Sequence, residues 1–124
     1  MKSYTNLEQS QKLAEILPVK SADMFLALNG TQPVMSKYID GGFVTADNTA
    51  IPCWSLAALL NYLREIDVFP EIEADKSGVV MNISFYDVED ESRLVPIRSI
   101  EAKTEDFIDT CYEMILKLKE KDLL

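Results

Sequence analysis

The stretch EIEADKSGVVMNISF, residues 71–85, decides the fold class of this chain of 124 residues. Acidic residues alternate with apolar ones from Glu71 to Asp75, and a second alternating run begins at Val79. A period of two is typical of strands with one buried face. Turn residues 76–78 separate the runs, so the stretch predicts an antiparallel hairpin. One face of its second strand is predicted to carry Val79, Met81, Ile83 and Phe85.

C-terminal to this hairpin, the pattern predicts a loop at 87–92 and a strand at 93–100. Pro96 has no amide hydrogen to donate, which indicates an edge strand or a bulge. Apolar residues then recur at spacings of four, three and four, which predicts a helix over about 105–119 with Thr104 as its N-cap. Its apolar face comprises Phe107, Ile108, Cys111, Met114, Ile115 and Leu118.

At the N-terminal end, a helix is predicted over 6–17. Thr5 and Glu8 have the spacing of a capping box, and Pro18 ends the helix. A hairpin follows, with a strand at 24–28, a turn at Asn29-Gly30 and a return strand at 34–39. Pro33 places that return strand at an edge, and a short strand is predicted at 43–46.

A further helix is predicted to begin at Ser55, its N-cap, with Trp54 packing onto Leu59 just before it. From Leu56 to Leu63 only Asn61 is strongly polar. A helix that is apolar almost all round is buried on more than one side. We therefore expect it at the centre of the core, and its apolar surface also allows a homodimer.

The elements together predict one α+β domain over residues 1–124. The order is α-β-β-(β)-α-β-β-β-α. We expect an antiparallel sheet of about five to six strands, with the three helices packed mainly on one face. No apolar run approaches the roughly 20 residues of a membrane-spanning helix, and the N-terminal residues lack a secretory apolar stretch. The expected location is the cytoplasm.

Residue types restrict the chemistry. The chain has no histidine and two cysteines, and its glycines lack the spacing of a phosphate-binding loop. Ser-His and Cys-His nucleophile pairs and zinc sites are therefore excluded. We expect no cofactor, no metal and no catalytic residue. Cys53 lies near a helix start, where a thiol can be activated, but its neighbours indicate packing instead. Cys111 falls on an apolar helix face, as a small buried residue does.

The formal net charge of −9 is concentrated in one segment. Between Glu65 and Glu91 there are nine acids and one base, Lys76. Such a surface repels phosphate backbones and suits a basic protein partner, so we expect no direct nucleic-acid binding. The short apolar runs give the expectation of no membrane partner. The same acids could instead only keep an exposed strand soluble, and those at 87–91 lack the glycine and spaced glutamate of a calcium loop. The candidate partner-binding residues are Glu71, Glu73, Asp75, Asp87, Glu89, Asp90 and Glu91.

Three stretches carry a resemblance: TNLEQS at 5–10, IPCWSLAALL at 51–60 and CYEMILKL at 111–118. In this order they resemble small uncharacterised proteins of prophages and mobile elements in gut anaerobic bacteria. The resemblance covers about a fifth of the chain. It implies a bacterial, cytoplasmic setting and an accessory role. That group has no established activity, so the resemblance assigns no functional residue.

The sequence therefore favours a non-enzymatic accessory protein that acts by protein–protein binding through an acidic face. The alternative is a small hydrolase or ligand-binding protein that uses carboxylates or Cys53. The alternative requires a concave pocket holding ionisable groups with shifted pKa values.

Overall fold

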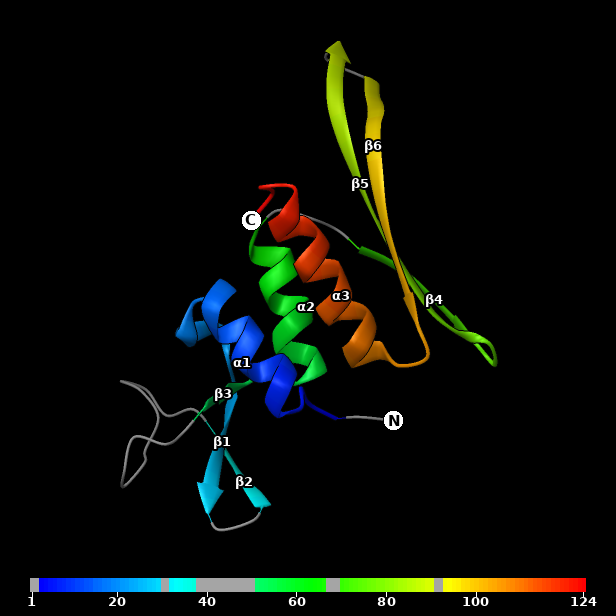
Figure 1. Ribbon diagram of the computed structural model, residues 1–124. Helices are drawn as coiled ribbons and strands as arrows, with labels where there is room; N and C mark the ends of the chain where they lie inside the picture. Colours follow the sequence, from blue (N-terminus) through cyan, green and yellow to red (C-terminus); the bar gives the residue numbers. More distant parts are fainter. Residues whose placement is uncertain (1–2, 30–31, 38–50, 67–69, 91–92) are drawn as a thin grey trace. The chain divides into compact units, whose positions relative to one another are not determined.

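The computed structural model describes residues 3–29, 32–37, 51–66, 70–90 and 93–124, and confirms the α+β class (Figure 1). Its contacts divide the chain into a first unit, residues 1–60, and a second unit, residues 61–124. In chain order the elements are α1 (Leu7–Ile16), the 3-10 turn η1 (Val19–Ser21), β1 (Met24–Asn29), β2 (Gln32–Lys37), β3 (Ile51–Cys53), α2 (Leu56–Glu65), β4 (Pro70–Asp75), β5 (Gly78–Asp90), β6 (Arg93–Thr104) and α3 (Phe107–Glu120).

The first unit contains an antiparallel sheet with the strand order β2-β1-β3. β2 is an edge strand, as Pro33 predicted. Asn29 pairs with Gln32, so Asn29 belongs to β1 and not to the predicted turn, whose other residue, Gly30, lies outside the described residues. The third strand is β3, which pairs Cys53 with Met24. The sequence pattern had placed residues 51–53 just before a helix and had not predicted a strand there. The strand predicted at 43–46 lies outside the described residues.

The start of α1 differs by one residue from the prediction. Asn6, and not Thr5, is the N-cap, and its side chain accepts a hydrogen bond from the backbone amide of Gln9 at 2.8 Å. The Gln9 side chain accepts in return from the Asn6 amide at 3.1 Å, which completes a capping box. Thr5 does not cap the helix because its hydroxyl accepts from the Trp54 amide at 3.1 Å and bonds the Ser10 hydroxyl at 2.8 Å.

α2 begins where the sequence predicted. The hydroxyl of Ser55 accepts from the Ala58 amide at 3.2 Å, so Ser55 is the N-cap. The helix is not buried all round, however. Leu59 and Leu63 are fully buried, whereas Asn61 and other residues on one side are exposed, so α2 is amphipathic. The exposed residues are Ala57, Asn61, Arg64 and Glu65.

The second unit contains a separate antiparallel sheet with the order β4-β5-β6. The predicted single sheet of five to six strands is therefore not confirmed. The 71–85 hairpin is confirmed, with Asp75 opposite Gly78. β5 continues to Asp90, so residues 87–90 belong to a strand and not to the loop predicted over 87–92. β6 is an edge strand, and the register shifts between Phe85 and Tyr86, where Pro96 pairs, as the proline predicted.

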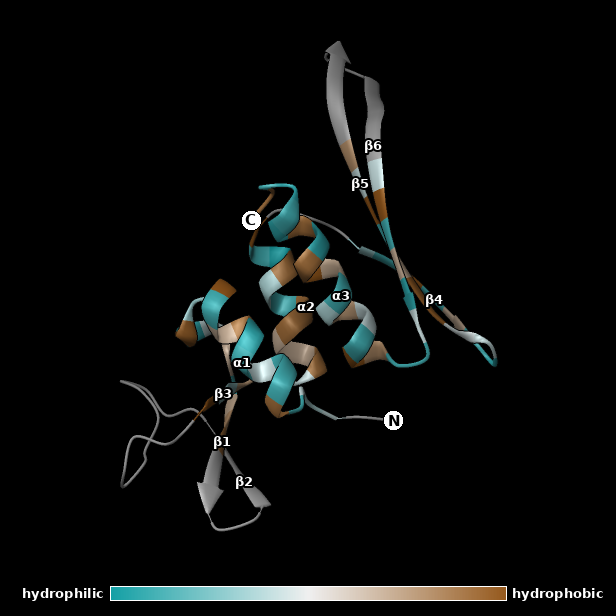
Figure 2. Cartoon of the chain, viewed as in Figure 1, coloured by the Kyte–Doolittle hydropathy of each residue, from teal (hydrophilic) through white to brown (hydrophobic). Residues whose placement is uncertain are grey.

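α3 packs against β5 and β6 of the second unit. Its N-cap is Asp106, whose carboxylate accepts from the amides of Ile108 and Asp109. The predicted cap, Thr104, lies too early, and its hydroxyl instead donates to the Asp106 carbonyl at 2.7 Å. The predicted apolar face is confirmed, except that Phe107 is only half-buried, and α3 shows the corresponding alternation of hydropathy (Figure 2). Its buried apolar residues are Ile108, Cys111, Met114, Ile115 and Leu118.

No helix within the described ranges has the length and apolar character needed to cross a membrane.

Candidate functional site

The sheet of the second unit has two chemically different faces. Residues opposite one another in neighbouring strands share a face, so the strand register assigns every described side chain to one side. The inner face is apolar and lies against α3, with Met81, Ile83 and Ala102 buried. The outer face is the opposite side of the three strands. Its described residues include the rows Glu71–Asn82–Glu101 and Glu73–Val80–Lys103, with Ser84 opposite Ser99 next to the first row and Asp75 opposite Gly78 next to the second.

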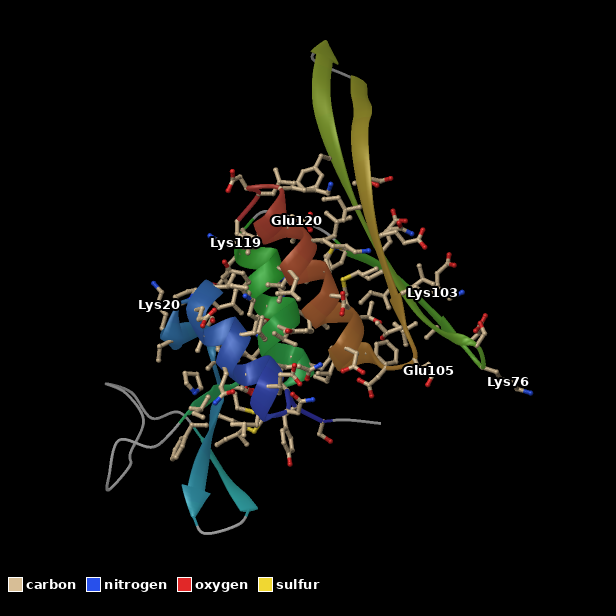
Figure 3. All side chains as sticks on the ribbon, in the orientation of Figure 1. Lys20, Lys76, Lys103, Glu105, Lys119 and Glu120 are labelled. Carbon is tan, nitrogen blue, oxygen red and sulfur yellow. The ribbon has the colours of Figure 1, made fainter. Side chains whose placement is uncertain are left out.

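The outer face is accessible, and its described residues include more acids than bases. Glu71, Glu73 and Glu101 are exposed, and Lys103 is an exposed base on the same side. Figure 3 shows Lys103 directed away from α3. Alternation along β4 thus brings two candidate residues, Glu71 and Glu73, to the same face of the strand, as the sequence predicted.

Asp75, the third acid of β4, has a structural role. Its carboxylate accepts from the Ser77 amide at 2.7 Å and from the Ser77 hydroxyl at 2.6 Å. These two bonds stabilise the ionised carboxylate and lower the pKa of Asp75 below its ordinary value of 3.8, with a smaller contribution from Lys103. An aspartate that bonds the backbone two residues later forms an Asx turn. Asp75 therefore holds the β4–β5 turn, at whose tip Lys76 projects into solvent (Figure 3).

The structure does not place the remaining candidate acids beside Glu71 and Glu73. Asp87, Glu89 and Asp90 lie in β5, beyond the shift of register at Phe85 and Tyr86. Glu91 lies outside the described residues. Among the side chains that are described, no group of three acids or cysteines is placed to hold a metal ion.

A buried polar cluster lies in the first unit, and no local pattern in the sequence indicated it. It consists of Thr5, Ser10 and Cys53, each of which is fully buried. The hydroxyls of Thr5 and Ser10 are 2.8 Å apart, and the Thr5 hydroxyl also accepts from the Trp54 amide at 3.1 Å. The Cys53 thiol donates to the Thr5 carbonyl at 3.4 Å.

The burial of Cys53 opposes its use as a nucleophile. Burial, with a smaller contribution from the charge of Asp23, raises the pKa of the thiol. Hydrogen bonds from Thr5 and Ser10 act in the other direction but do not reverse the shift. A reactive cysteine needs a thiolate that its substrate can reach. The geometry instead gives Cys53 the role of a packing residue with a hydrogen bond.

Two further hydrogen bonds fix the chain around Trp54. The indole nitrogen donates to the Ser21 hydroxyl at 2.9 Å, and that hydroxyl donates to the Pro18 carbonyl at 2.6 Å. The carboxylate of Asp23 accepts from both the amide and the hydroxyl of Ser55. Residues 52–55 therefore have a structural role, because the polar groups of Cys53, Trp54 and Ser55 are hydrogen-bonded within the first unit.

A shallow depression of about 190 Å³ lies on α2, lined by Asn61, Arg64 and Glu65. Its lining includes one basic side chain, Arg64, and one acidic side chain, Glu65. None of the candidate partner-binding acids lines it. Nearby Tyr62 has its pKa raised by burial and by the charge of Glu65. The depression is open, and its lining includes no nucleophile.

The chain matches no protein-family model, no curated protein and no solved structure.

Proposed function

We propose that the protein is a non-enzymatic accessory protein that binds another protein through the acidic outer face. The observation that carries the proposal is the placement of Glu71 and Glu73, two exposed carboxylates on the same side of an edge strand. They belong to the segment that holds nearly all of the excess negative charge. A face of this kind attracts and orients a basic surface.

The packing of the second unit supports this use of the outer face. α3 covers the inner face, where Met81 and Ile83 are buried. The half-buried Val80 and Asn82 lie on the outer face between acids and Lys103. Val80 and Asn82 offer a surface that a partner can bury, and the charged residues beside them can select that partner.

The proposal includes a bacterial cytoplasmic setting and an accessory role. Both rest on the resemblance of residues 5–10, 51–60 and 111–118 to small prophage proteins. The alternative of a hydrolase using Cys53 finds no support in the structure, because that thiol is buried and hydrogen-bonded.

The test is affinity capture from a bacterial lysate with three versions of the protein. The first is the wild type, and the second carries Glu71→Lys and Glu73→Lys. Asp75 is left unchanged because it holds the turn. The matched control carries Glu113→Lys and Glu120→Lys, the same change of charge at two exposed positions of α3. All three are compared by circular dichroism.

We expect a partner that the wild type and the α3 control retain and the β4 variant loses. Its retention should weaken as salt rises from 0.05 to about 0.5 M, because exposed charge pairs are screened over a Debye length of roughly 10 Å at 0.1 M. A partner retained equally by all three proteins would exclude the outer face as its contact.

A further inference from the structure

The two edges of the second unit's sheet are not equivalent. β6 contains Pro96, which donates no hydrogen bond, and its register shifts beside that proline. β4 pairs with β5 in continuous register from Pro70 to Asp75, and its only proline is the first residue. In β6 only residues 98–104 pair in continuous register, and there the Lys117 ammonium donates to the Glu101 carbonyl at 2.6 Å. Of the two edges, β4 is therefore the one that is uninterrupted along its whole length.

The residues of β4 leave this edge accessible. Four of its six residues are exposed, namely Glu71, Glu73, Ala74 and Asp75. Within the described residues, β4 pairs only with β5. An accessible strand edge presents backbone amides and carbonyls to any extended segment that can align with it.

The charge of β4 opposes pairing with a second copy of this chain. Strand addition that keeps both faces of the sheet continuous must align outer-face residues with outer-face residues. On β4 these are Glu71, Glu73 and Asp75, so two copies would place carboxylates opposite carboxylates. Like charges directly opposite one another destabilise a strand pair. The occupant must therefore be a different segment with opposite charge.

We propose that the partner adds an extended strand to the free edge of β4 and carries lysine or arginine at alternate positions. This proposal rests on the proposed function and specifies its partner. The basic residues lie on the outer face opposite Glu71 and Glu73, and the residues between them lie on the inner side next to the half-buried Ile72. β4 has six residues, which sets the length of the paired segment at about six.

The test uses synthetic peptides of eight residues with the labelled full-length protein. The first peptide alternates lysine with valine and threonine. A second has the same composition with its lysines in one block. Two more keep the alternating sequence but carry N-methyl groups on either the odd or the even amides, which removes the hydrogen-bond donors of one edge and leaves every charge in place. Binding is measured by NMR titration, together with amide hydrogen exchange in β4.

We expect the alternating peptide to bind roughly three- to ten-fold more tightly than the block peptide, since two cross-strand ion pairs depend on the spacing. It should slow amide exchange in β4, and one of the N-methylated peptides should lose binding. The Glu71→Lys and Glu73→Lys protein should bind the alternating peptide at least three-fold more weakly than the α3 control.

Equal binding of all four peptides, abolished by the β4 substitutions, would overturn strand addition while leaving the acidic face as a contact. No binding by any peptide would also overturn strand addition, and the lysate capture would then decide the proposed function by itself. Equal binding by the β4 and α3 variants would count against both.

Discussion

Thr5 has the residue type of an N-cap and directly precedes the cap of α1, yet its side chain is fully buried. Its hydroxyl contacts Ser10, Cys53 and the amide of Trp54. Two of these partners lie 48 and 49 residues away in the chain. The local pattern could not reveal that competition, and Asn6 caps the helix because the Thr5 side chain is committed elsewhere.

Thr5→Val should destabilise the protein by about 1–3 kcal/mol. Valine preserves the volume but removes the hydroxyl, so the buried Trp54 amide loses its acceptor. Thr5→Ser keeps the acceptor and loses one methyl group, which should cost only about 1 kcal/mol. Urea unfolding followed by Trp54 fluorescence measures both. A valine variant as stable as the wild type would show that the cluster contributes no net stability.

Because the Cys111 thiol is buried, we predict that the free energy of unfolding falls at alkaline pH. Burial raises the pKa of this thiol from 9.0 to about 12, so the folded state keeps it protonated where the unfolded state ionises. A raised pKa contributes stability that is complete below pH 9 and is lost as the pH rises toward 12. The slope approaches about 1.4 kcal/mol per pH unit.

The measurement is urea unfolding of the wild type and Cys111→Ala at pH 8, 9, 10 and 11. Cys53 titrates in both proteins, so its contribution cancels. We expect the free energy of unfolding of the wild type to fall by about 1–3 kcal/mol more than that of the alanine variant over this range. Parallel curves would mean that the Cys111 thiol ionises as readily in the folded protein as in the unfolded one.

At the scale of elements, the sequence predicted those with strong local periodicity. The apolar spacing of α3 and the alternation of β4 and β5 were confirmed, because local pattern and burial agree there. β3 was missed because three residues are too few to show a period, and its pairing with β1 joins segments far apart in the chain. The end of β5 was missed because Asp87 and its acidic neighbours indicated a loop.

The candidate site was predicted in part for the same reason. Alternation alone brought Glu71 and Glu73 to an exposed face. Asp75 followed the same alternation and was therefore predicted as a contact residue. The serine two residues later in the sequence indicates instead that its carboxylate holds a turn.

The β4–β5 turn also explains why residue 78 is glycine. Gly78 has φ of +143°, and a Cβ there would lie 2.6 Å from the backbone oxygen of Thr104. Gly78→Ala should therefore destabilise the protein by about 1–3 kcal/mol from backbone conformation alone, with the contact adding to it. Lys76→Ala, in the same exposed turn, should stay within about 0.5 kcal/mol of the wild type. Equal midpoints in urea for the two variants would contradict this account of the turn.

At the scale of the whole molecule, the order of helices and strands was compatible with one sheet, and the described residues instead form two. Periodicity fixes which residues of a strand face a core, but it does not identify the neighbouring strand. The number of sheets follows from long-range pairings such as Met24 with Cys53 and Val80 with Lys103. Neither pairing has a local signal in the sequence.

The two units should nevertheless unfold together, as expected for a single domain. α2 is one continuous helix whose buried residues Leu59 and Leu63 fall on either side of the boundary between the units. Unfolding of either unit takes half of this ten-residue helix with it, and the remaining five residues are too few to be helical by themselves. Loss of one unit should therefore destabilise the other.

A Cys53→Ala variant makes this testable, because it leaves Trp54 as a reporter of the first unit and Cys111 as the single thiol, in the second. Trp54 fluorescence and pulsed labelling of Cys111 are followed across the same urea series. We expect coincident midpoints, as two-state unfolding requires. Separate midpoints would instead establish two domains that unfold independently. The lower midpoint would then identify the less stable of the two.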